Sequence, residues 1–252
     1  MVSSTEPAVG GGRVTWAAVA ERGLRTLAPI TVAAVGLSVL IGGVGGRLVM
    51  SLLSATNPDN DGRISDDGFV IGRFDLGGTV QLVGFSVQVG LAAAACYLVA
   101  RQLVFGPRWF QVTSMAVGAG TVVGALIVHP DGIDFTAFDP PWLPILLFVA
   151  IPVVYVACLA LLAEHWVASE QFQSVDLRML SLVTVVLWAL GAVTLVLLIA
   201  VVATWGVWQL VRDTAIGTAV RSQVSRWVAR AALVLIFVAA VTNLIDDTSV
   251  LV

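Results

Sequence analysis

The chain has 252 residues, of which 58% are hydrophobic and only 12% are charged. Soluble domains carry about 25% charged residues, so this composition excludes an ordinary soluble protein. The net charge is −3, and all positive charge comes from 13 scattered arginines that form no basic stripe, which excludes a nucleic-acid partner. The use of arginine without lysine indicates a GC-rich genome, so we expect a bacterial source.

The first segment of the chain is polar. Residues 1–12 combine Gly, Ser and Pro, which predicts a disordered tail. This segment has no apolar core followed by a cleavage site, so we expect no removable signal peptide. Residues 13–26 then place Trp16, Val19 and Leu27 on one stripe with charged residues around the rest of the circle. This pattern is typical of a short amphipathic helix at the membrane interface.

Six long apolar runs follow, separated by short polar breaks. A bilayer core about 30 Å thick requires about 20 apolar helical residues to cross it, and every run approaches or exceeds that length. Tryptophans near the ends of most runs fit an aromatic belt. We therefore expect an all-α integral membrane protein whose spans cover residues 27–53, 77–100, 110–128, 142–163, 179–208 and 227–245.

The arginines predict the orientation. With the N-terminus in the cytoplasm, the inner flanks hold six arginines and the outer loops hold five. The conflict comes wholly from the connection between the fifth and sixth runs, since the first four runs alone give six against two. We expect a plasma-membrane protein with a cytoplasmic N-terminus and, from the even number of spans, a cytoplasmic C-terminus.

Two loops on the expected outer face resemble each other. Residues 67–75 and 131–139 each begin with Asp-Gly and end with Phe-Asp. The first loop carries an Asp-Asp-Gly turn between extended stretches, which predicts a hairpin, and residues 133–138 alternate like a strand. We expect both loops to form a small β-structured extracytoplasmic cap.

Small residues recur every four positions in the first three runs, which is typical of close helix packing in lipid. This pattern predicts a tight centre made by helices one to three. The residues concerned are Ser38, Gly42, Gly46, Ser86, Gly90, Ala94, Ala116, Gly120 and Gly124.

Three polar side chains fall within the apolar runs. Arg47 has apolar sequence on both sides. One interpretation is a substrate or proton-coupling site. The other is an arginine near the outer interface, where its side chain extends toward water or pairs with Asp75 or Asp139. The second interpretation is favoured, because Arg47 lies about 30 Å along its helix. Gln81 and Gln88 share one face, where they either line a polar cavity or hydrogen-bond to other helices.

The outer loops contain the candidate metal ligands. Residues 57–68 resemble an EF-hand calcium loop, but Gly68 stands where a bidentate acid is needed. The candidate ligands are Asp59, Asp61, Asp131 and Asp134, and an acidic, solvated turn is the competing interpretation. We expect no cofactor, because no phosphate-binding or catalytic motif is present.

The favoured hypothesis is therefore a non-catalytic structural or accessory subunit. Its partners would be the lipid bilayer and other membrane proteins, which would bind the Leu- and Val-rich fifth and sixth helices. The alternative is a small-solute or ion transporter or channel that uses Arg47, Gln81 and Gln88. A membrane enzyme with a metal at the outer acidic loops is the third hypothesis.

Overall fold

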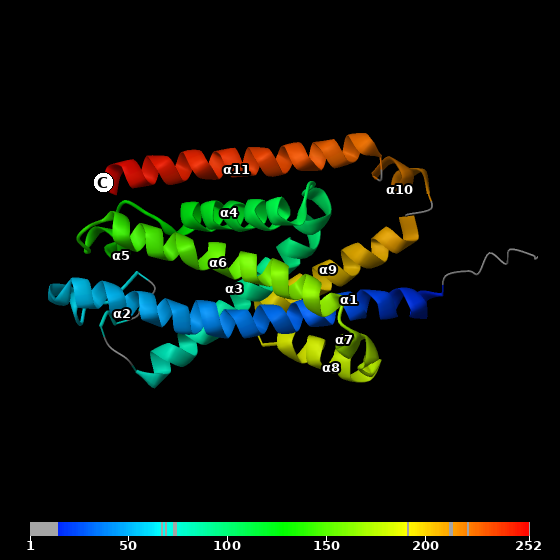
Figure 1. The fold of residues 1–252 in the computed structure, drawn as a ribbon, viewed down its shortest axis with the longest axis horizontal. Coiled ribbons are helices and arrows are strands. Elements are labelled where there is room, and N and C mark those ends of the chain that lie inside the picture. Colours follow the sequence, from blue (N-terminus) through cyan, green and yellow to red (C-terminus); the bar gives the residue numbers. More distant parts are fainter. Residues whose placement is uncertain are drawn as a thin grey trace, which may run out of the picture.

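A computed structural model describes residues 15–66, 68, 70–72, 75–190, 192–211, 214–220 and 222–251, so the expected tail over residues 1–12 lies outside the described residues. The described chain is a bundle of helices (Figure 1). In chain order they are α1 (Trp16–Leu37), η1 (Ser38–Gly45), α2 (Gly46–Thr56), η2 (Pro58–Asn60), α3 (Leu76–Leu103), α4 (Arg108–Ile127), α5 (Ile133–Thr136), α6 (Trp142–Val167), α7 (Glu170–Ser174), α8 (Leu177–Trp188), α9 (Ala192–Val211), α10 (Ala215–Val220) and α11 (Gln223–Leu251).

Among the described residues, six helices are long and apolar enough to cross a membrane, as expected of a multi-pass membrane protein. The first of them is a continuous rod of 41 residues, Trp16–Thr56, that joins α1, η1 and α2. At about 1.5 Å per residue this rod is about twice as long as the bilayer core is thick. Residues 16–26 form its first turns, and their expected place at the interface stays a prediction.

The middle of this rod, η1, is a π-helix. Its glycines allow a close approach to α3, since a Cβ at Gly42 would lie 2.7 Å from the Cβ of Ser86 and one at Gly43 would lie 2.7 Å from Val83. Without side chains at these positions the two helices meet almost backbone to backbone. The small-residue stripes of the first two runs therefore pack together as expected.

The third stripe packs elsewhere. Gly120 of α4 faces Val153 of α6, and a Cβ at Gly124 would lie 2.8 Å from Val149 of the same helix. The prediction that helices one to three form a tight centre is therefore wrong for the third helix. The third run instead pairs with the fourth, because Gly120 and Gly124 let α4 approach α6 closely.

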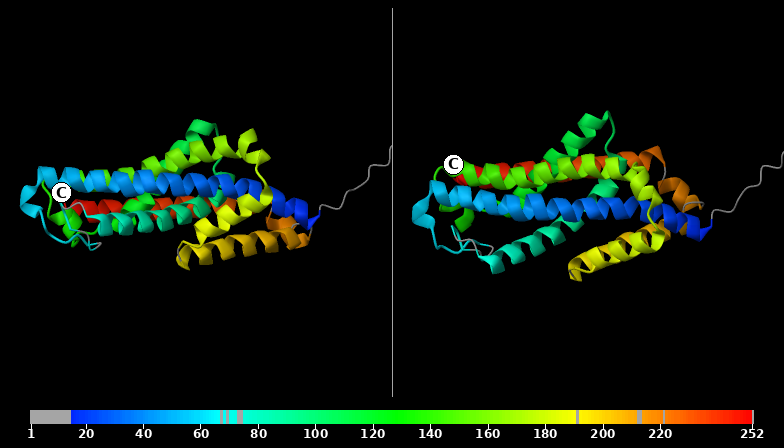
Figure 2. Two further views of the ribbon diagram at one scale, coloured as in Figure 1. Left: turned by 90° about the horizontal axis from the view of Figure 1, so that it is seen from below. Right: turned by 60° about the horizontal axis from the view of Figure 1, so that its bottom comes forward.

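The expected span over residues 179–208 is two helices, α8 and α9, that form a hairpin. The first turn of α8 lies beside Ala17 and Glu21 at the start of α1, and its last residue, Trp188, reaches Thr31 further along α1. The chain then returns, because Trp205 near the end of α9 lies against Gly23. Figure 2 shows the closed end of this hairpin about halfway along the bundle.

The backbone at the hairpin's closed end is hydrogen-bonded, as membrane depth demands. The amide of Ala189 donates to Val185, and the hydroxyl of Thr194 donates to the carbonyl of Trp188 at 2.8 Å. Trp188 and Thr194 are both fully buried. The two residues on either side of the turn are therefore packed inside protein, whereas Leu190 and Val193 are exposed.

Because α8 and α9 enter and leave at the same end of the bundle, α11 runs from that end to the opposite one. Arg230, near its start, donates to the carbonyl of Leu103 at the end of α3, and Asn243, near its end, donates to Ala125 at the end of α4. We call the end where α1 begins the N-terminal face and the end where α11 finishes the C-terminal face (Figure 1). The expectation that both chain ends share one face is therefore wrong.

The expected β-structured cap is also wrong, although the two loops do meet. The described part of the first loop contains one isolated antiparallel bridge, between Ile64 and Val70, and no strand. Residues 133–136, expected as a strand, form the helical turn α5, which buries Asp134 and Phe135. The segment is too short for its alternating pattern to distinguish a strand from a single helical turn.

Candidate functional site

The polar residues of the described chain gather in three layers: the loops of the C-terminal face, a hydroxyl cluster at mid-depth, and ion pairs at the N-terminal face. The first layer ties the loop after α2 to the loop before α6. Asp66 and Asp134 are reciprocally bonded, since each backbone amide donates to the carboxylate of the other residue, at 3.2 and 3.1 Å. Asn57 accepts from the amide of Asp139 at 2.9 Å, and Asn60 donates to Ala137 at 2.5 Å.

This layer explains what the expected calcium ligands do. Asp61 accepts from the hydroxyl of Ser54 at the end of α2, and Asp134 binds the other loop. Asp59 and Asp131 are exposed to solvent. Within the described residues no three His, Cys, Asp or Glu side chains gather as metal ligands would. The geometry therefore favours loop fixation over an EF-hand site.

Arg47 lies near the C-terminal face and is only 5% exposed. Its guanidinium points at the first turn of α3, where a Cβ at Gly78 would lie 2.6 Å from Nη2. The carboxylate of Asp75 flanks the same point at 2.8 Å and accepts from the amide of Gly78. Arg47 is thus buried against the α3 terminus and beside an acid, near the C-terminal face, and its expected place at the membrane interface stays a prediction.

The two glutamines are not brought together with Arg47 in a polar site. Gln81 is exposed on the surface of α3 and Gln88 is half-buried. Neither side chain has a hydrogen bond to a described residue. Their expected role in a polar path therefore stays a prediction.

A hydroxyl cluster at mid-depth was missed by the sequence reasoning. Tyr155 of α6 places Oη 3.1 Å from the carbonyl oxygens of both Ala34 and Gly90, between which it shares its one hydrogen. Ser38, the first residue of η1, donates to Ala34 at 2.7 Å and lies 3.4 Å from the Tyr155 hydroxyl. One side chain thus links α1, α3 and α6. The available signal was a tyrosine in the middle of an apolar run.

A second buried contact fixes the α8–α9 hairpin. The indole N–H of Trp188 donates to the hydroxyl of Thr31 at 2.9 Å, and this hydroxyl donates to the carbonyl of Leu27. Around the indole lie Val87, Leu91, Ala95 and Leu198. Trp188 therefore supplies both the polar and the apolar part of the contact between the hairpin and the bundle.

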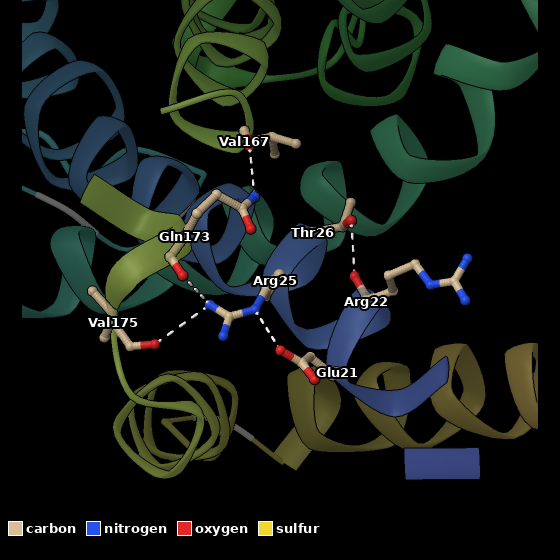
Figure 3. A network of polar contacts seen from close by, with 7 residues as sticks. All are labelled: Glu21, Arg22, Arg25, Thr26, Val167, Gln173 and Val175. Atoms are coloured by element: carbon tan, nitrogen blue, oxygen red, sulfur yellow. Dashed lines mark hydrogen bonds and ion pairs between the residues drawn. The ribbon is translucent and has the colours of Figure 1, made fainter. Parts of the chain in front are cut away.

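The N-terminal face is held by ion pairs. Glu164 near the end of α6 accepts from the hydroxyl of Tyr97 at 2.9 Å and pairs with Arg101 at 3.0 Å. Arg25 pairs with Glu21 at 3.0 Å and donates to the carbonyl of Gln173, which joins α1 to the α7 segment (Figure 3). These contacts connect α3 to α6 and α1 to α7 near the helix ends, where the side chains still reach water.

No protein-family model, curated protein or solved structure matches the chain. The function must therefore be argued from the geometry of the described residues.

Proposed function

We propose that this protein is a non-catalytic accessory subunit that binds another integral membrane protein through α9 and α11. The observation that carries the proposal is the uneven packing of the spans. In the first span, 44% of the residues in its most apolar stretch are buried inside the protein. The same fraction is only 11% for α9 and 6% for α11.

The attachment of α11 is narrow. It contacts α4 along one side, where Leu244 approaches Gly124. Near its start, Arg230 lies over the rings of Phe105 and Trp227, at 4.9 and 5.3 Å from the ring centroids. In lipid, helices associate through van der Waals packing and hydrogen bonds, with little hydrophobic drive between them. A helix packed along one edge gains more contact from a protein on its open side.

The polar groups of the bundle support the same proposal. The hydroxyl of Tyr155, the carboxylate of Glu164 and the Asp66–Asp134 pair all hold helices or loops of this chain to one another. A scaffold needs such fixed internal contacts, whereas a catalytic site needs polar groups aimed at a substrate.

The first test is site-specific photo-crosslinking in cells. A photoreactive residue at Leu235, 68% exposed on α11, is expected to give one discrete adduct with a second membrane protein, because a partner helix would lie within reach of that side chain. The same residue at Leu126, also 68% exposed but on α4, is the matched control and is expected to give none. The adducts are detected by gel shift and identified by mass spectrometry.

Equal labelling by lipid alone at both positions would contradict the proposal, because α11 would then face the bilayer like any other helix. An adduct of twice the protein's own mass would replace the foreign partner with a second copy of this chain.

We also propose that the N-terminal face lies in the cytoplasm of the cell, at the plasma membrane. Among the described arginines, seven belong to the N-terminal face and two to the C-terminal face. Three arginines between residues 208 and 227 caused the conflict in the sequence, and the described one, Arg226, lies at the N-terminal face because α8 and α9 return to it. The arginine excess then agrees with the positive-inside rule.

A labelling experiment tests this orientation. In a chain with Cys96 and Cys158 replaced by alanine, single cysteines at Asp59 and Ser249 are expected to react with an impermeant maleimide on intact cells, since both positions are exposed at the C-terminal face. A cysteine at Ser174, exposed at the N-terminal face, is expected to react only after permeabilisation. Opposite reactivity at positions 174 and 249 would reverse the orientation, and equal reactivity would refute the opposite placement of the chain ends.

A second candidate function is the transport of a small solute or ion. It is favoured by the α8–α9 hairpin, because interrupted helices that end at mid-depth form the binding sites of many transporters. Solute flux into vesicles containing the purified protein alone would favour this function over an accessory role.

A further inference from the structure

A hollow of about 280 Å³ lies between the first turns of α1 and α8 at the N-terminal face. We call it the α1–α8 groove. Its α1 wall consists of Ala17, Ala20 and Leu24, with Glu21 at the edge, and its α8 wall consists of Leu177, Arg178 and Ser181. The groove is thus apolar inside, with charged groups along its border.

Two tryptophans near the groove indicate that it lies at the depth of the lipid headgroups. Trp205 lies against Gly23, beside the groove residue Leu24. Trp166 at the end of α6 stacks on Phe172 of α7, with ring centroids 5.4 Å apart, just before α8 begins. Tryptophans concentrate where the hydrocarbon core meets the headgroups, so a lipid can enter this groove with its phosphate at the level of the arginines.

The charge of the groove is positive. The carboxylate of Glu21 is neutralised by Arg25, whose guanidinium also donates to Gln173 and Val175 (Figure 3). Arg178 is exposed and makes no ion pair with a described residue. One guanidinium charge is therefore left at the border of the groove, and guanidinium is a strong partner for phosphate oxygens.

We propose that the α1–α8 groove binds one anionic phospholipid, with its phosphodiester on Arg178 and the start of an acyl chain between the two helices. Ala17 and Ala20 leave the room that the chain occupies, and Leu24 and Leu177 give it apolar contact. Zwitterionic phosphatidylcholine fits less well, because its positive choline group would gain little from the carboxylate of Glu21, which already pairs with Arg25. This site is independent of the proposed partner surface on α9 and α11.

The test uses the full-length protein purified in detergent and titrated with phosphatidylglycerol or with phosphatidylcholine of the same acyl chains. A ligand that binds only the folded state raises the melting temperature. Phosphatidylglycerol is expected to raise it, and Arg178→Gln and Ala20→Leu are each expected to abolish the rise, the first by removing the cation and the second by filling the groove. Arg108→Gln, at an exposed arginine of the same face, is the matched control and should keep the full rise.

A photoreactive acyl chain provides a readout that needs no variant. Crosslinked peptides from residues 17–24 and 177–181 are the expected products. An equal rise with phosphatidylcholine, or with glycerol phosphate lacking acyl chains, would overturn the lipid assignment. A rise lost in Arg178→Gln and Arg108→Gln alike, but kept in Ala20→Leu, would show charge attraction to the whole face and overturn the groove. Crosslinks confined to other helices would do the same.

Discussion

Replacing Gly90 by valine is expected to abolish accumulation of the folded protein. A Cβ at position 90 would lie 2.6 Å from Oη and 3.1 Å from Cζ of Tyr155, and it would also collide with the hydroxyl of Ser38. Overpacking a well-packed site costs about 1–3 kcal/mol, and valine adds two methyl groups beyond this Cβ. The substitution would also separate the Tyr155 hydroxyl from the two carbonyl oxygens that accept from it, which leaves a buried donor without an acceptor at membrane depth.

The same helix supplies the control for this prediction. Gly84 of α3 has no atom within 4 Å of an added Cβ, so Gly84→Val has the same change in helix propensity without the collision. Size-exclusion chromatography of the solubilised protein, followed by thermal unfolding, measures both variants against the parent. Similar yields and melting temperatures for the two variants would contradict the close crossing of α1, α3 and α6 at Gly90.

Much of this fold could be predicted from the sequence, because the membrane imposes strong length and polarity constraints on a helix. The apolar runs, the glycine contact between the first two spans and the meeting of the two outer loops all appear in the structure. The run over residues 179–208 could not be interpreted correctly from hydropathy, since a hairpin and a long span have the same composition. The distinction depends on tertiary partners, namely Thr31 for Trp188 and Gly23 for Trp205.

The candidate site was predicted less well than the fold. Arg47 could be placed near the interface by counting helical rise, and the structure places it at the first turn of α3. The aspartates were expected as metal ligands or solvated turns, whereas Asp61 and Asp134 hydrogen-bond within and between the loops. Side-chain to backbone pairing across 68 residues of sequence leaves no local pattern, so only the folded arrangement shows it.

The error in the position of the C-terminus had a single cause. Each crossing reverses the side of every segment that follows, so counting residues 179–208 as one crossing moved the last helix to the wrong side. The arginine conflict at residues 212, 221 and 226 was the warning in the sequence, because it disappeared if one C-terminal crossing was removed.

Replacing Trp188 by alanine is expected to detach the α8–α9 hairpin from the bundle while the other helices remain folded. The indole is fully buried, and large aromatic residues replaced by alanine in a core cost about 3–5 kcal/mol. The variant also loses the hydrogen bond from the indole to Thr31. Once Trp188 no longer packs against α1, shielded amides near the ends of α8 and α9 at the closed end of the hairpin become accessible.

Hydrogen exchange followed by mass spectrometry measures this change directly, and peptides from α8 and α9 should exchange faster while peptides from α4 and α6 keep their protection. Trp188→Phe should show a smaller effect, because it retains most of the apolar contact and loses only the N–H donor. Trp109→Ala removes a tryptophan that is 70% exposed at the start of α4 and serves as the control. Unchanged exchange in the hairpin of Trp188→Ala would contradict this anchor, and a uniform rise over all helices would show that the hairpin is an inseparable part of the bundle.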